Sequence, residues 1–169
     1  MKLTEAQDSF IESWGALGSQ WGISKTMAQI HALLLISPQS LCAEDVMSRL
    51  NISRGNANMN MRALIDWGLA ERVIKLGERK EFFKAEKDMW KVVVRIAQER
   101  RKRELQPILR TIEEVSKIND PEADALEMKE FVNTVNNIGD VSEKINKSFD
   151  KLIAADEHWF TGSLLKLMR

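Results

Sequence analysis

Apolar residues recur along most of this chain at steps of three and four, the spacing that places them on one face of an α-helix. The first stripe consists of Phe10, Trp14, Leu17 and Trp21. Gly22 follows it, in the position where a glycine commonly ends a helix. A second stripe spans residues 27–35, preceded by a Ser24 that can cap its helix and followed by Pro38. The pattern therefore predicts two helices before Pro38.

Two shorter helices are predicted next, over residues 43–50 and roughly 54–67. Asn51 follows the first of them, and asparagine tolerates the left-handed conformation of a tight helix exit. Ser53 is a good cap for the second helix, and Gly68 is placed to end it. Two helices joined by so short a turn could form any helical hairpin, of which the helix-turn-helix is one kind.

An alternating pattern predicts two strands, 71–75 and 79–83, joined by the glycine-bearing connection 76–78 as a β-hairpin. Residues 87–118 then return to a strong helical pattern. Pro107 should kink or interrupt that long helix, because proline removes a backbone donor and its ring crowds the preceding turn.

The C-terminal third is predicted to be helical as well. Asp120-Pro121 is a cap and first-turn signal for a further helix, which we expect to end near Gly139. Asp140 can cap a last helix, with a break near residues 161–163.

The order of elements predicts a mainly α fold, a winged helix-turn-helix with a three-helix core and a β-hairpin wing. We place this domain at residues 24–88, after an N-terminal dimerisation helix at 1–23 and before a C-terminal helical dimerisation region at 89–169. The terminal helices carry more apolar surface than so small a domain can cover, which indicates a dimer. The expected dimer contacts are Phe10, Trp14, Leu17, Ile145, Phe149 and Leu152.

Composition sets the class of protein. With 44% hydrophobic and 30% charged residues, the 169-residue chain suits a globular protein with a real core, and it contains no apolar run long enough for a membrane span. The first residues lack the apolar stretch of a signal peptide, so we expect a cytoplasmic protein. One cysteine and two histidines argue against a disulfide or a zinc cluster, and we expect neither metal nor cofactor.

Charge is unevenly distributed although the net charge is zero. Residues 1–48 carry −3, residues 49–103 carry +8 and residues 104–169 carry −5. A basic middle between acidic flanks is a local footprint for phosphate, because the local field matters more for such binding than the total charge does.

The predicted helix at 54–67 has an outward face suited to DNA. At 100° a residue this face shows Gly55, Met59, Arg62 and Asp66, flanked by Asn56 and Asn58. Arginine and asparagine match guanine and adenine edges in the major groove, which a recognition helix touches with its first turns. Glycine in a helix costs up to about 1 kcal/mol, so close approach of DNA would explain Gly55. The hairpin adds Lys75, Arg79 and Lys80 at its tip.

The motif as a whole resembles the MarR superfamily of transcriptional regulators, and most closely its GbsR branch. The resemblance covers roughly residues 8–110 and is carried by four segments, 42–46, 50–56, 64–69 and the wing 77–83. It implies a homodimeric bacterial or archaeal transcription factor, usually a repressor, that binds a palindromic site in double-stranded DNA. The recognition-helix positions of the family then fall on Ser53, Arg54, Gly55, Asn56, Asn58 and Arg62, and Arg79 is the wing arginine that enters the minor groove. Cys42 departs from the family, which often has Ser or Thr as the cap there.

Several residues allow two interpretations. Cys42 could sense oxidants, since a helix N-terminus lowers a thiol pKa, but without a second cysteine we favour an inert thiol. His31 lies in an apolar run and fits a hydrogen-bonded core or interface residue better than a metal ligand. The run 100–103 is four basic residues that could bind phosphate, and we favour a solvated or salt-bridged helix face.

Two wider questions concern function. A pocket for a small-molecule effector is plausible between the DNA-binding domain and the dimer helices, with Trp14, Trp21 and Trp90 as candidates and no ligand identified. An enzyme is not expected, because catalytic triads, phosphate-binding glycine loops and metal-ligand clusters are missing from the sequence. The main alternative is a winged-helix protein-interaction module in a larger assembly, without sequence-specific DNA binding.

Overall fold

The computed structural model describes residues 1–20 and 22–167, with side chains up to residue 154. The chain forms two compact units, Met1–Val92 and Val93–Arg169. Trp21, one of the three candidate effector residues, lies outside the described residues. Within the described part, none of the helices combines the length and apolar character that crossing a membrane would require.

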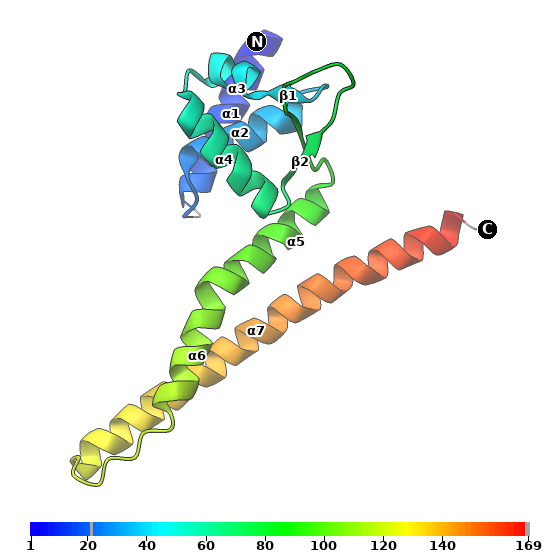
Figure 1. Cartoon of the computed structure of the whole chain (residues 1–169). Coiled ribbons are helices and arrows are strands. Elements are labelled where there is room, and N and C mark those ends of the chain that lie inside the picture. The colour runs from blue at the N-terminus through cyan, green and yellow to red at the C-terminus, as the bar shows by residue number, and fades with distance from the viewer. Residues whose placement is uncertain (21, 168–169) are drawn as a thin grey trace. The chain divides into compact units, whose positions relative to one another are not determined.

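The first unit combines four helices with a small sheet (Figure 1). Its elements are α1 (Leu3–Gln20), α2 (Lys25–Ile36), β1 (Leu41–Cys42), α3 (Ala43–Leu50), α4 (Arg54–Asp66), β2 (Ala70–Val73) and β3 (Phe82–Ala85). The strands form an antiparallel sheet in the order β1-β3-β2. Fully buried apolar side chains from α2, α3 and α4 make the core of this unit, among them Ile30, Leu34, Val46, Met61 and Leu64.

The predicted helix limits in this unit are confirmed. Ser24 caps α2 by accepting a hydrogen bond from the backbone N–H of Met27, at 3.4 Å. Ser53 caps α4 in the same way, with the N–H of Asn56 at 3.3 Å. Asn51 adopts the left-handed conformation after α3 with a φ of 52°, and Gly68 does so after α4 with a φ of 68°. Each limit is therefore set by the local backbone chemistry that the sequence displays.

Helix α1 packs tightly against α2 through two buried glycines. A Cβ atom at Gly18 would lie 2.5 Å from the Cβ of Ala28, and one at Gly15 would lie 2.6 Å from the Cγ of Gln29. Both glycines thus serve close helix approach. The N-terminal helix is consequently part of the first unit, and the side chains of Phe10 and Leu17 on this helix remain partly exposed, at 37% and 36%.

The hairpin differs from the prediction. Val73 pairs with Phe82 and Ala70 with Ala85, so the connection spans residues 74–81 and the second strand begins three residues later than expected. This register buries the side chains of Phe83 and Ala85. Beyond Val73 the chain leaves the sheet and is largely exposed to solvent. Burial on one face, rather than alternation alone, decides the register. The two-residue strand β1, which pairs with β3, was not predicted.

The second unit is a helical hairpin. Its elements are α5 (Met89–Arg100, which begins in the first unit), a π-helical turn at Arg101–Leu105, α6 (Gln106–Val115) and α7 (Ala125–Leu167). The predicted interruption at Pro107 is confirmed as that π-helical turn, in which Gln106 bonds back to the carbonyl of Arg101. The wider turn relieves the crowding that a proline ring causes four residues earlier.

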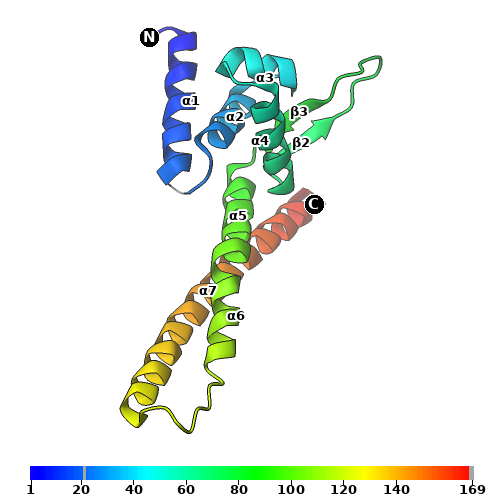
Figure 2. The same ribbon diagram turned by 60° about the vertical axis from the view of Figure 1, so that its left-hand side comes forward.

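Three predicted helix limits in this unit are wrong. The last helix starts at Ala125, where Asp124 accepts hydrogen bonds from Leu126 and Glu127 at 3.0 Å each, and not at Asp120-Pro121. It then continues through Gly139 and through residues 161–163 without a break. Gly139 is a packing residue, since a Cβ atom there would lie 3.1 Å from the Cγ2 of Ile112 on α6, which packs against α7 (Figure 2).

Candidate nucleic-acid interface

Helix α4 presents the two faces that its sequence predicts. Ala57, Met61 and Leu64 are buried in the core of the first unit. On the opposite side Gly55 and Arg62 are exposed, and Met59 retains 64% of its accessible surface. Met59 and Arg62 therefore lie on the face of α4 that the core leaves uncovered.

Gly55 lies on this exposed face, as predicted. A Cβ atom built there would meet nothing within 4 Å. Its φ is not in the left-handed region either, so neither packing nor backbone geometry within the described part of the chain calls for glycine. The missing side chain therefore leaves open space at the first turn of α4, where another backbone could approach.

A buried asparagine, which the sequence reasoning missed, supports this face. Asn60 is only 3% exposed, and its Nδ2 donates to the backbone carbonyl of Asn56 at 2.9 Å and to the Asn56 Oδ1 at 2.6 Å. These bonds hold Asn56 in one orientation. The signal was available, because Asn60 is three residues after Ala57 and thus on the apolar side of the helix. Asn58 is half-buried and makes no such bond within the described part.

The connection between β2 and β3 extends away from the helices of its unit (Figure 2). Arg79 and Lys80 are exposed in this connection rather than in a strand. Lys75 is already engaged, since its Nζ lies 3.8 Å from the centroid of the Phe82 ring in a cation–π contact. Arg79 has no ion-pair partner among the described side chains.

A carboxylate that the sequence analysis did not single out links the two arms of the candidate interface, which are helix α4 and the connection 74–81 between β2 and β3 (the wing). Glu44, in the first turn of α3, accepts a hydrogen bond from Arg54 at the start of α4 (Nη2 to Oε1, 3.0 Å). Its Oε2 lies 3.8 Å from the Lys80 Nζ in the wing. A hydrogen bond from the Cys42 thiol, together with its own backbone N–H and these cations, holds the pKa of Glu44 below its usual value. The carboxylate is therefore charged at neutral pH.

Comparison with known proteins supports the fold. No protein-family model and no curated protein matches this chain. A solved structure of a transcriptional regulator does match, with a TM-score of 0.67 at 15% identity over 90% of this chain and 99% of that one. The likeness shows that this chain shares the fold of that structure. This fold is mainly helical with a small antiparallel sheet, consistent with a winged helix.

Cys42 has a structural role in this fold. Its side chain is buried, and burial raises the pKa of the thiol, which disfavours the reactive thiolate. Its backbone N–H donates to the Asp45 Oδ2 at 2.9 Å, so the acid three residues on closes the start of α3. The favoured interpretation of an inert thiol agrees with this geometry, and Asp45 supplies a cap that offsets the poor capping by sulfur.

His31 is a core residue, and the described residues contain no cluster of three or more groups that could hold a metal ion. Its side chain is 3% exposed, and desolvation lowers its pKa to about 4. The ring stands 6.1 Å from the Trp14 ring, centroid to centroid. The expected hydrogen bond is missing at one ring nitrogen, since the buried Nε2 has no partner within the described part.

The basic run at 100–103 is salt-bridged, as we favoured. Arg101 pairs with Asp150 of α7 at 2.8 Å, and Arg100 pairs with Glu104 at 3.0 Å. Glu99 accepts from Arg103 at 3.1 Å. These cations are paired within their own unit, in agreement with the favoured interpretation.

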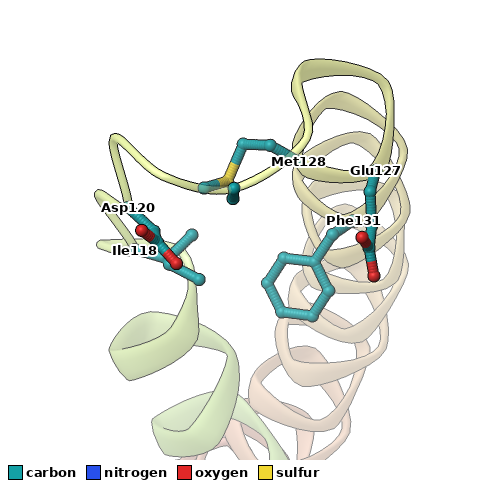
Figure 3. Close-up of a pocket in the computed structure, with 6 residues that line it drawn as sticks. Ile118, Asp120, Glu127, Met128 and Phe131 are labelled. Carbon is teal, nitrogen blue, oxygen red and sulfur yellow. The ribbon is translucent and has the colours of Figure 1, made fainter.

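A pocket of about 420 Å³ lies in the second unit, where the connection after α6 meets the start of α7 (Figure 3). It is lined by Ile118, Asp120, Ala123, Glu127, Met128 and Phe131. None of these was an expected effector residue. The expected effector residues lie elsewhere: Trp14 is half-buried on α1, and Trp90 is exposed at the start of α5.

Proposed function

We propose that this protein is a sequence-specific, homodimeric DNA-binding regulator of transcription, a repressor of the GbsR-like branch of the MarR superfamily that acts in the cytoplasm. The observation that carries the proposal is the exposed face of α4, with its open first turn at Gly55 and with Met59 and Arg62 beside it. The likeness of fold to a solved transcriptional regulator supports it.

Each arm of the interface has its own role in this proposal. Asn58 and Arg62 contact base edges in the major groove, because their side chains offer the donors and acceptors that adenine and guanine match. Arg79, at the tip of the wing, enters the minor groove, and Lys80 contacts phosphate. Ser53 caps the recognition helix, and the amide groups at its first turn face the DNA backbone.

A homodimer would allow the protein to contact two DNA half-sites at once. Phe10 and Leu17 on α1 and Ile145 on α7 are exposed apolar side chains, while Trp14, Phe149 and Leu152 are half-buried. We propose that residues 1–23 and 89–169 supply the dimer contacts and that residues 24–88 bind DNA. A two-fold dimer then requires a palindromic operator. Light scattering should report about twice the chain mass of 19.4 kDa.

The test separates base contacts from phosphate contacts. Selection from random duplex DNA should yield a palindromic site, and binding should weaken steeply with salt. On that site Asn58→Ala should cost about 1–3 kcal/mol, with little effect on random DNA. Lys80→Ala should weaken binding to both DNAs alike and lower the salt slope by about one unit.

The alternative of a protein-interaction module predicts another outcome. Such a module would select no sequence and show no salt-dependent DNA binding, although it folds normally. Equal losses on both DNAs for Asn58→Ala would instead remove Asn58 as a specificity residue while leaving DNA binding in place. The small-molecule effector remains part of the proposal, with Trp14, Trp21 and Trp90 as its predicted contacts.

A further inference from the structure

Glu44 stands between the two elements that the proposed function brings to DNA. One carboxylate oxygen lies 3.0 Å from the guanidinium of Arg54, the first residue of the recognition helix. The other lies 3.8 Å from the ammonium of Lys80, in the connection 74–81 that forms the wing. A single acid on α3 thus neutralises one cation on each arm.

Stability of the fold does not account for this arrangement. All three side chains are substantially exposed, with 40% of the Glu44 side chain, 63% of Arg54 and 56% of Lys80 accessible. Ion pairs so open to solvent contribute little to folding, because water and salt screen them and ordering long side chains opposes them. Glu44 is also favourable at a helix N-terminus, but that needs neither cation.

A carboxylate in this position has the hydrogen-bonding geometry of a phosphate. Both groups are anions that present paired oxygens to a guanidinium fork and accept from an ammonium. A DNA phosphate that lies across the start of α4 and the wing would seek the same two donors. It would find them already held by Glu44.

We propose that Glu44 is a built-in competitor of DNA phosphate, which holds Arg54 and Lys80 in the free protein and must release both cations when DNA binds. The inference rests on the proposed function and adds to it a residue that limits affinity. Because the two ion pairs are broken on any sequence, Glu44 opposes binding to random DNA as well as to the operator. It therefore restrains the sequence-independent attraction that the basic segment would otherwise exert.

The variant Glu44→Gln keeps the shape of the side chain and removes its charge. It should bind a random-sequence duplex roughly three- to tenfold more tightly than wild type at low salt, the effect expected of two exposed ion pairs. The gain should shrink as salt screens the pairs. A thermal melt close to that of wild type would show that the variant is folded.

Glu78→Gln is the matched control. Glu78 is exposed in the same wing connection, and the described part of the chain offers it no ion-pair partner. Removing its charge should strengthen binding less than Glu44→Gln does. In a background of Arg54→Ala and Lys80→Ala, Glu44→Gln should give no more than Glu78→Gln, because no held cations remain.

The outcomes separate this inference from the proposed function. A wild-type protein without salt-dependent DNA binding would remove the proposed function itself. A wild type that binds DNA, with a folded Glu44→Gln variant that binds no more tightly, would overturn only the role of Glu44. A gain that persists in full in the doubly substituted background would also overturn it, since the effect would then be general charge repulsion.

Discussion

His31 should make the stability of this protein depend on pH between about 7.5 and 4. The histidine is 3% exposed on α2, and desolvation lowers its pKa from 6.5 to about 4. In the unfolded chain the imidazole titrates at its ordinary pKa, near 6.5. The unfolded state therefore takes up a proton at a higher pH than the folded state does, and stability falls as the pH drops below 6.5.

The magnitude follows from the difference between the two pKa values. One pKa unit corresponds to about 1.4 kcal/mol, so a difference of about 2.5 units removes roughly 3 kcal/mol once both states are protonated. About 2 kcal/mol of that loss should have occurred by pH 5. Above about pH 7.5 the imidazole is neutral in both states and contributes no pH dependence. The carboxyls of Glu44 and Asp45, whose pKa values are lowered in the folded protein, also contribute stability that is lost as the pH falls, and comparison with a variant that lacks only His31 removes their contribution.

Urea unfolding followed by tryptophan fluorescence measures the effect, at one protein concentration and at pH 7.5, 6.5, 5.5 and 5.0. His31→Leu is the control, because it fills a similar volume and cannot titrate. It removes an unsatisfied ring nitrogen, so its stability at pH 7.5 should lie within about 1 kcal/mol of wild type. Wild type and His31→Leu share every other titratable group, so the difference between their free energies of unfolding isolates the contribution of His31. If that difference does not change with pH, the imidazole is not held neutral and the reasoning is refuted.

Two further predictions concern residues already described. Gly18→Ala should destabilise the protein by about 1–3 kcal/mol, because the new methyl group clashes with Ala28. Gly55→Ala should leave the thermal melt unchanged or raise stability by up to about 1 kcal/mol. Equal melting temperatures for the two variants would contradict the close packing of α1 on α2. Gly55→Leu should keep the thermal melt and nearly abolish DNA binding, measured by fluorescence anisotropy, and normal binding would show that the first turn of α4 does not approach DNA.

Helix limits were predictable where a few adjacent residues determine them. Ser24 and Ser53 offer a hydroxyl to the free N–H groups of the next turn, and Gly68 accepts the left-handed conformation that stops a helix. None of these signals depends on a distant part of the chain. The faces of α4 were predictable for the same reason, since its periodicity and its burial are expressed within four turns.

The errors arise where distant contacts determine the outcome. Gly139 looks like a helix stop in sequence, but a Cβ atom there would lie 3.1 Å from the Ile112 side chain on α6, so the packing of α6 on α7 favours a small residue at this position. The hairpin register depends on the burial of Phe83 and Ala85 against the first unit, which alternation within the segment does not specify. Asp124 caps α7 although Asp120-Pro121 carries the stronger local signal. Packing overrides local propensity at Gly139 and in the hairpin, whereas the start of α7 is decided between two local caps.

The sequence gives the net charge of a segment, but it does not show which of its cations are paired in the folded protein, and this pairing affects binding. The basic segment 49–103 carries a net charge of +8, yet several of its cations pair with acids outside the segment: Arg54 and Lys80 with Glu44, and Arg101 with Asp150 at 2.8 Å. Among the described side chains, Arg62 on α4 and Arg79 in the wing have no acidic partner. One such cation stands on each arm of the proposed interface. In the proposed complex, Arg62 and Arg79 can contact DNA without first breaking an ion pair. Arg54 and Lys80 must first leave Glu44. The cations that contribute most to DNA affinity therefore need not be those in the most positively charged part of the sequence.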